Sequence, residues 1–171
     1  SATMMANAAR DPYWQGSVRR ELLEYPKASA VIEHECSKCH MPMARYQAHA
    51  EGRKLEMFTH LAPGAWNKPE GELSIDGVSC VLCHQITPEG LGEDSSFTAG
   101  FKVDHETAWG ERRAYGPREA SSGANDLMKA ASGFVPAKGD HMTATELCAS
   151  CHTVLTHSLA PGAEDLPPLP E

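Results

Sequence analysis

The stretch "ELCASCHTVLTH" (residues 146–157) places Cys148 and Cys151 three positions apart and follows the second cysteine at once with His152. The same arrangement occurs in "HECSKCHMP" (residues 34–42) and in "GVSCVLCHQI" (residues 77–86). These three copies of Cys-x-x-Cys-His use all six cysteines of the chain. The fold must therefore accommodate three sites of one kind, each made of two thiols and an imidazole.

Cys-x-x-Cys-His is typical of the attachment site of a c-type haem. Two thiols add across the two vinyl groups of one porphyrin, so their sulfur atoms must lie a short, fixed distance apart. The histidine follows directly because the same turn then presents a neutral imidazole to the iron. We predict three covalent haems c, with cysteine anchors Cys36, Cys39, Cys80, Cys83, Cys148 and Cys151 and proximal iron ligands His40, His84 and His152.

Other uses of Cys-x-x-Cys are a zinc site built from two such pairs, a redox-active dithiol and a structural disulfide. None of these needs a histidine immediately after the second cysteine. Histidine is 9 of 171 residues, so three such placements by chance have a probability of about 1 in 7,000. The histidine therefore favours haem, with zinc as the main alternative.

The composition leaves little material for a core made of side chains alone. The mean hydropathy is −0.41, aromatic residues make up 6% of the chain, and 171 residues serve three haems. Three large apolar macrocycles would supply the missing buried area. We therefore expect one trihaem domain over residues 1–171, with its haem segments at 1–60, 61–124 and 125–171, and a largely unfolded apoprotein.

The charge and the hydropathy pattern restrict the kinds of partner and the cellular location that are expected. The formal net charge of −8 argues against nucleic acid as a partner and suits docking to basic patches on redox proteins. The sequence has no run of 18 apolar residues, so it predicts no membrane-spanning helix. Because c-type haems are attached outside the cytoplasmic membrane, we expect a bacterial periplasmic or extracellular protein.

Local patterns predict a mainly α, loop-rich fold with short helices around a haem core and little or no sheet. Asp11 and Pro12 are typical of a helix start, and Trp14, Val18, Leu22 and Tyr25 then recur on one face. Further helices are expected over 28–40, over 124–132 with a stop at Gly133, and over 143–152 with a Thr143–Glu146 capping box. Residues 61–79 and 87–124 are expected to be loop, and the proline-rich tail 160–171 to be extended.

The second axial ligand of each iron decides between an electron carrier and an enzyme. Six histidines lie outside the motifs, so a histidine is available for the second axial position of every iron. We predict His141 and His60 as distal ligands, with Met128 as a further candidate; a hydrogen-bonded surface histidine and a core methionine are the alternatives. His34, His49, His105 and His157 are weaker candidates, as are Met4 and Met5. Arg112, Arg113 and Arg118 are candidates to pair with haem propionates.

Four segments together resemble bacterial multihaem cytochromes c: "ECSKCHMPMARYQA", "DGVSCVLCHQI", "YGP" at residues 115–117, and "HMTATELCASCHTVLT". The chain is similar to the tetrahaem-to-octahaem superfamily that includes hydroxylamine oxidoreductase and its electron-transfer relatives. The resemblance implies closely packed haems with histidine as the usual distal ligand, at positions such as His60 and His141. Relatives carry further motifs before and after this region, so the resemblance also suggests a fragment of a longer chain.

The function expected from the residues is electron transfer through three six-coordinate haems. The expected partners are redox proteins or other multihaem cytochromes, in a homo-oligomer or a larger complex. Two alternatives remain open. One is a small-molecule oxidoreductase with one open haem, and the other is a subunit of an extracellular cytochrome filament.

Overall fold

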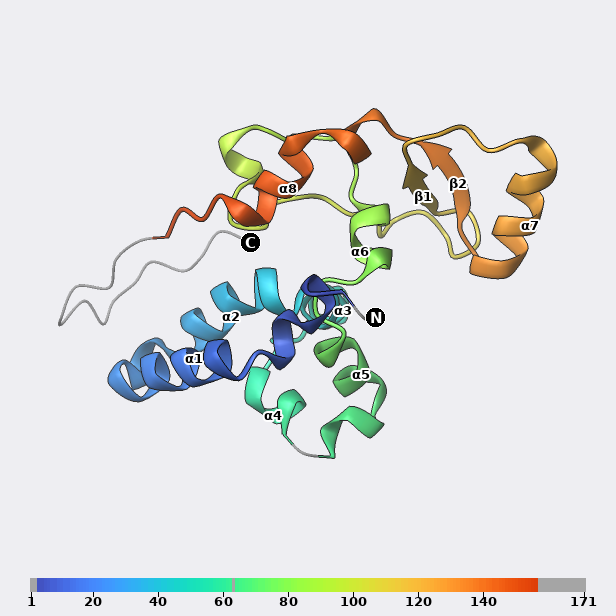
Figure 1. Cartoon of the computed structure of the whole chain (residues 1–171). Coiled ribbons are helices and arrows are strands. Elements are labelled where there is room, and N and C mark those ends of the chain that lie inside the picture. Colours follow the sequence, from blue (N-terminus) through green and yellow to red (C-terminus); the bar gives the residue numbers. More distant parts are fainter. Residues whose placement is uncertain (1–2, 63, 157–171) are drawn as a thin grey trace. The chain divides into compact units, whose positions relative to one another are not determined.

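The computed structural model describes residues 3–62 and 64–156, which form two compact units (Figure 1). Of the described residues, unit 1 contains those up to Ser79 together with Thr156, and unit 2 runs from Cys80 to Leu155. The first Cys-x-x-Cys-His motif belongs to unit 1, and the other two belong to unit 2. The expected division into three haem segments stays a prediction, and the extended tail lies outside the described residues.

The fold is mainly helical with short elements and one small sheet, as the sequence predicts. Unit 1 consists of the helices α1 (Pro12–Glu24), α2 (Ser29–His40), α3 (Pro42–Ala50), α4 (Met57–Leu61) and α5 (Pro69–Ile75), with 3-10 turns at Met5–Arg10, Pro26–Ala28 and Ala65–Asn67. Unit 2 contains α6 (Cys80–Gln85), α7 (Ser122–Ser132), α8 (Thr145–His152), β1 (Arg113–Gly116) and β2 (Val135–Lys138), with 3-10 turns at Asp94–Ser96 and Asp140–Thr143.

Two helix boundaries follow the predicted signals. The Asp11 side chain accepts a hydrogen bond from the Tyr13 amide at 2.9 Å and so caps α1, whose first residue is Pro12. At the other signal, α7 ends before Gly133, which adopts the left-handed conformation at φ 76°. Both predictions are confirmed, because each depends only on neighbouring residues.

Two local predictions are wrong. Residues 61–79 are not a continuous loop, since they form a 3-10 turn and α5. Proline at the first position of α5 starts this helix. Gly71 lets the 3-10 turn Ala65–Asn67 lie close to α5, because a Cβ at position 71 would be 2.0 Å from the Ala65 carbonyl oxygen. The capping box of α8 is also absent: its N-cap is Ala144, and the Thr143 hydroxyl donates to the Asp140 carbonyl at 3.1 Å.

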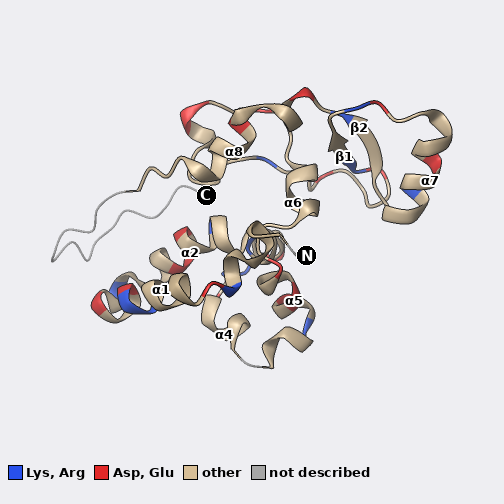
Figure 2. Cartoon of the chain, in the orientation of Figure 1, with Lys and Arg blue, Asp and Glu red and all other residues tan. Residues whose placement is uncertain are grey.

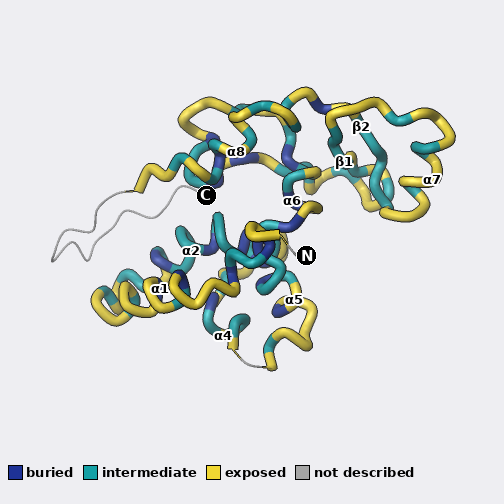
Figure 3. Tube along the Cα trace, in the orientation of Figure 1, coloured by how far each residue is buried: buried dark blue, intermediate teal, exposed yellow. Residues whose placement is uncertain are grey.

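Unit 1 has a hydrophobic core made of side chains. Trp14 and Val18 of α1, Ile32 of α2, and Met41 and Met57 form its buried cluster together with Ala9. Leu22, Tyr25, Cys36 and Phe58 are among the residues packed against it. The predicted apolar face of α1 is therefore confirmed, and it packs against the helix that carries the first motif (Figure 3).

Unit 2 is organised differently. Strands β1 and β2 pair in parallel, from Arg113 opposite Val135 to Gly116 opposite Lys138, and α7 connects them. The buried hydrophobic residues of unit 2 are Leu82, Ile86, Ala99 and Phe101, and none of them belongs to the cluster described above. Val81, Trp109, Leu127, Met128, Val154 and Leu155 are exposed. Within the described residues, unit 2 thus buries little apolar surface of its own.

Acidic and basic side chains occur on both units (Figure 2). Exposed ion pairs include Arg20–Glu24 at 3.0 Å and Lys129–Glu111 at 2.8 Å, and such pairs contribute little to stability. Among the helices of the described ranges, none has both the length and the apolar composition of a membrane-spanning helix.

We expect Trp14→Ala to lower the free energy of unfolding of unit 1 by about 3–5 kcal/mol, because it removes a large side chain from the core. Trp14 is 9% exposed, whereas the adjacent Tyr13 is 84% exposed. Tyr13→Ala is therefore the matched control and should change the unfolding free energy by no more than about 0.5 kcal/mol. Urea denaturation followed by circular dichroism measures both, and equal effects of the two substitutions would contradict the assigned core.

Candidate haem-attachment sites

All three Cys-x-x-Cys-His motifs lie on helices. The first occupies the last residues of α2, the second forms most of α6, and the third ends α8. In an α-helix, residues at i, i+3 and i+4 share one face. Each motif therefore presents two thiols and one imidazole on the same side of its helix, which is the donor set that a covalently attached haem requires.

Each motif helix buries one spacer residue of the motif. Ser37 and Ser150 are 0% exposed, and their hydroxyls donate to the carbonyls of His34 at 2.8 Å and Leu147 at 2.7 Å. Leu82, which is the second spacer residue of its motif as Ser150 is of the third, is 5% exposed. Because the spacers turn inward, much of the cysteine and histidine face is left accessible: Cys80, Cys148, His84 and His152 are exposed.

The six cysteines are thiols in the structure, with no disulfide between any two of them. Burial, followed by the nearby carboxylate of Glu35, raises the pKa of the Cys36 thiol to about 11. Burial and the three other thiols of unit 2 raise the pKa of Cys83. A dithiol that exchanges with disulfides needs a lowered thiol pKa, so these surroundings do not suit a redox-active pair.

The imidazole of His40 is held on both sides. Its Nδ1 lies 3.1 Å from the Ala8 carbonyl oxygen, and its ring stacks on Trp14 with centroids 4.2 Å apart and planes 3° apart. Burial lowers the pKa of His40 and so favours the neutral imidazole. A neutral ring that donates Nδ1–H to a carbonyl keeps Nε2 as its lone-pair nitrogen, the usual arrangement of a metal-bound histidine.

His84 has the same arrangement in unit 2. Its Nδ1 forms a hydrogen bond with the main-chain carbonyl of Tyr115, on strand β1. The donor again is Nδ1, so Nε2 is left for a metal. Two of the three motifs therefore share a tautomer set by the main chain, although they belong to different units and use unrelated acceptors.

The second and third motifs influence each other electrostatically. The charges of Cys148 and Cys151 both raise the pKa of Cys83, so the Cys83 thiol lies within electrostatic range of the third motif. Two backbone hydrogen bonds also tie the third motif to residues that follow the second, from Thr98 to the Thr153 carbonyl at 2.9 Å and from Ala99 to the Ser150 carbonyl at 2.6 Å. Unit 2 thus gathers two candidate sites.

The zinc alternative requires four ligands that converge on one ion. Throughout residues 3–62 and 64–156, no group of three or more His, Cys, Asp or Glu side chains is arranged to hold a metal ion. The two cysteine pairs of unit 2 are neighbours but do not converge in this way. The donor set fits a haem, whose four porphyrin nitrogens already fill most of the coordination of the iron.

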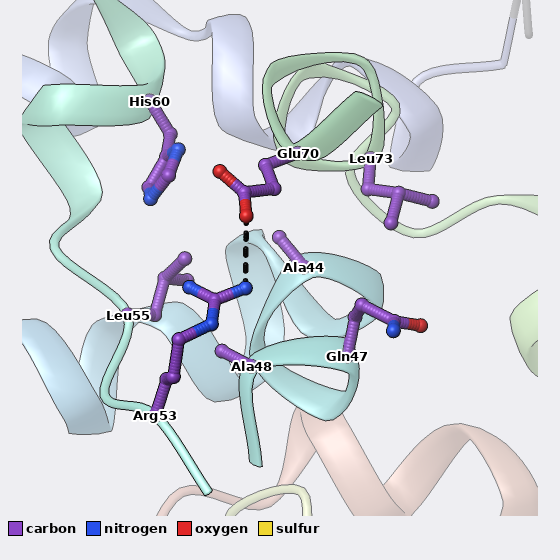
Figure 4. A pocket seen from close by; sticks show the side chains of 8 residues that line it. All are labelled: Ala44, Gln47, Ala48, Arg53, Leu55, His60, Glu70 and Leu73. Atoms are coloured by element: carbon purple, nitrogen blue, oxygen red, sulfur yellow. Dashed lines mark hydrogen bonds and ion pairs between the residues drawn. The ribbon is translucent and has the colours of Figure 1, made fainter. Parts of the chain in front are cut away.

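Of the predicted distal ligands, His60 lies on α4 and lines a small cavity of about 10 Å³ (Figure 4). The cavity also contains the ion pair between Arg53 and Glu70, at 2.9 Å. A cavity of this size holds about one water molecule, so the cavity is not itself a haem pocket. The ligand role of His60 stays a prediction.

His141 lies in the 3-10 turn after β2, where its Nε2 is 2.9 Å from the Ile86 carbonyl oxygen. Its ring also makes an edge-to-face contact with Tyr115, with centroids 4.9 Å apart. The structure therefore brings His141 to the end of the helix that carries the second motif. A bond from Nε2 to iron would replace the Ile86 hydrogen bond, and the ligand role stays a prediction.

The other candidates lie apart from these contacts. Met128 is 49% exposed on α7, and its ligand role likewise stays a prediction. His34 accepts a hydrogen bond from Arg45 at 3.4 Å, His49 and His105 are exposed, and His157 lies outside the described residues. Met4 and Met5 are also exposed. Arg112 donates to the carbonyls of Thr107 and His105, whereas Arg113 and Arg118 are exposed.

Sequence reasoning missed the groups that orient the motif histidines. Ala8 and Tyr115 act through main-chain carbonyls, which every residue carries, so no residue type signals them. Trp14 was placed on the inner face of its helix by periodicity, but its partner His40 is 26 positions away. The segment "YGP" was noted as part of a resemblance, without a role for Tyr115.

Comparison with known proteins finds no matching family model, no similar curated protein and no similar solved structure.

Proposed function

We propose that the chain is a multihaem c-type cytochrome, which transfers electrons between redox partners through three covalently attached haems. The observation that carries the proposal is the repeated geometry of the motifs. Three helices each carry two thiols and a histidine on one face, which is partly buried in the first motif and more exposed in the second and third. In two of the three, the main chain holds the imidazole with Nε2 available. A dithiol or a disulfide would need no histidine at this place, and a zinc site would need four ligands that converge on one ion.

The residues have separate roles in this proposal. Each cysteine thiol would hold the haem through a thioether, in which the S–H bond has added across the C=C bond of a vinyl group and no atom is lost. His40, His84 and His152 would bind the iron through Nε2. The carbonyls of Ala8 and Tyr115, by accepting Nδ1–H, make the imidazoles of His40 and His84 more basic and so stabilise ferric iron. Haem, when bound, supplies an iron that alternates between the ferric and ferrous states.

The division of the chain into two units supports electron transfer between the second and third haem sites, which both belong to unit 2. The second and third motifs lie in one compact unit, and their thiols are close enough for Cys83 to respond to Cys148 and Cys151. The shared backbone hydrogen bonds restrain the two attachment helices relative to each other. A pair of redox groups held in a common unit keeps a constant separation, which electron transfer requires.

The charge of the chain suggests the surface of its redox partners. Residues 80–155 contain 10 acidic and 6 basic side chains, a formal charge of −4, and ionised haem propionates would add to it. A partner with a basic patch would be attracted to such a surface, and the attraction would weaken as salt increases. We propose redox proteins or other multihaem cytochromes as partners, in the bacterial periplasm or outside the cell.

The first test is the intact mass of the native protein in denaturant, combined with metal analysis. We expect the polypeptide mass plus three haem groups, three iron atoms and no zinc per chain, and no thiol that reacts with an alkylating agent. Cys80→Ala/Cys83→Ala should carry one haem fewer and serves as the matched variant. A polypeptide that weighs no more than its amino acids would refute the proposal.

Electron paramagnetic resonance of the oxidised protein at low temperature then separates a carrier from an enzyme. We expect three low-spin ferric signals, because a carrier closes both axial positions of each iron. A high-spin signal from one of the three irons would instead support the alternative of a small-molecule oxidoreductase with an open haem.

Haem removal should affect the two units unequally. Unit 1 contains a side-chain core, whereas unit 2 buries few apolar residues and carries two attachment sites. In apoprotein produced without haem attachment, we expect limited proteolysis to cut first within residues 80–155, and amide exchange there to be fast. Equal protection of both units would show that unit 2 does not depend on haem for its core.

A further inference from the structure

The acceptor of the His84 hydrogen bond is part of a small, closely packed group in unit 2. Strand β1 presents successive carbonyls to opposite sides. The carbonyls of Arg112 and Gly116 accept from the amides of Val135 and Gly139, at 2.7 and 2.8 Å. The Tyr115 carbonyl points the other way and accepts from His84. The orientation of the His84 imidazole therefore depends on how this strand is held.

The Tyr115 side chain is held by His141. The two rings meet edge to face, with centroids 4.9 Å apart and planes 74° apart. His141 in turn donates from Nε2 to the Ile86 carbonyl at 2.9 Å, two residues beyond His84. The contacts form a closed circuit, from His84 to Tyr115, from Tyr115 to His141, and back to the chain at Ile86.

Gly139 completes this group of contacts because any side chain there would have to displace the rings of His141 and Tyr115. A Cβ at position 139 would lie 2.4 Å from Cε1 and 2.8 Å from Nδ1 of His141, and 3.1 Å from Cδ1 of Tyr115. The backbone of Gly139 is ordinary extended chain, with φ −135° and ψ 115°. The requirement for glycine therefore comes from the space taken by the two rings and involves no backbone strain.

We propose that Tyr115, Gly139 and His141 are positioning residues of the second haem site, which fix the Tyr115 carbonyl and through it the His84 imidazole. This inference rests on the proposed function, since it treats His84 as an iron ligand. The three residues act on the iron through His84, and in this role His141 keeps its hydrogen bond to Ile86 and is not itself an iron ligand. If the contacts among these three residues change, the Nδ1–H hydrogen bond of His84 becomes weaker and its imidazole less basic. The ferric state of that haem is then destabilised.

Gly139→Ala tests the proposal in the full chain with its haems attached. The added methyl group must displace His141 or Tyr115 while the backbone conformation stays allowed. Gly116→Ala is the matched control, because position 116 lies on the paired strand and a Cβ there meets no atom within 4 Å. The signal of the second haem is assigned from Cys80→Ala/Cys83→Ala, which lacks that haem.

We expect Gly139→Ala to change the g values of the second haem alone and to raise its reduction potential, while Gly116→Ala matches the wild type. If Gly139→Ala does not accumulate as folded protein, Tyr115→Leu removes the ring against His141, keeps the carbonyl, and should give the same selective change. Wild-type g values and potentials in a folded Gly139→Ala or Tyr115→Leu variant would overturn the positioning role. A wild-type chain without haem in denaturing mass spectrometry would instead overturn the proposed function itself.

Discussion

The structure depends on one geometric constraint, the placement of two thiols and an imidazole at i, i+3 and i+4 of a helix. This spacing puts all three groups on one face only if the segment is helical, so each motif specifies its own secondary structure as well as its chemistry. The buried spacers Ser37, Leu82 and Ser150 anchor the opposite side of the three helices. In the second and third motifs, the first cysteine and the histidine stay exposed, whereas the first motif is partly buried.

The two units meet the need for a core in different ways. Unit 1 packs α1 against α2 through Trp14, Val18 and Ile32, so the helix of the first motif is stabilised by ordinary side chains. Unit 2 has a small parallel sheet, exposed residues such as Val154 and Leu155, and few buried apolar side chains among its described residues. Under the proposed function, the haems complete a core that the side chains of unit 2 do not provide.

Sequence reasoning reached the features that neighbouring residues determine. The mainly helical class, the cap at Asp11, the stop at Gly133 and the helical approach to the first and third motifs are all confirmed. It failed where the conformation depends on a contact with the main chain that the residue types do not signal. Residues 61–79 contain a helix because Gly71 admits the Ala65 carbonyl, and α8 lacks its capping box because Thr143 belongs to the preceding turn. The same holds for the candidate sites. Their cysteines and histidines are visible in the sequence, whereas the main-chain carbonyls that orient the histidines are not.

The supports of the motif histidines explain why residue types reveal so little about them. His40 and His84 both donate to main-chain carbonyls, at Ala8 and Tyr115, and a carbonyl is present whatever the side chain is. The side chains that matter are those that hold the carbonyl in place, such as Tyr115 packed on His141, and the glycine that makes room for both rings. Substitutions at these positions would leave every donor of the motifs intact and still alter the imidazole. The specificity of such a site therefore lies in packing around the main chain as much as in its ligands.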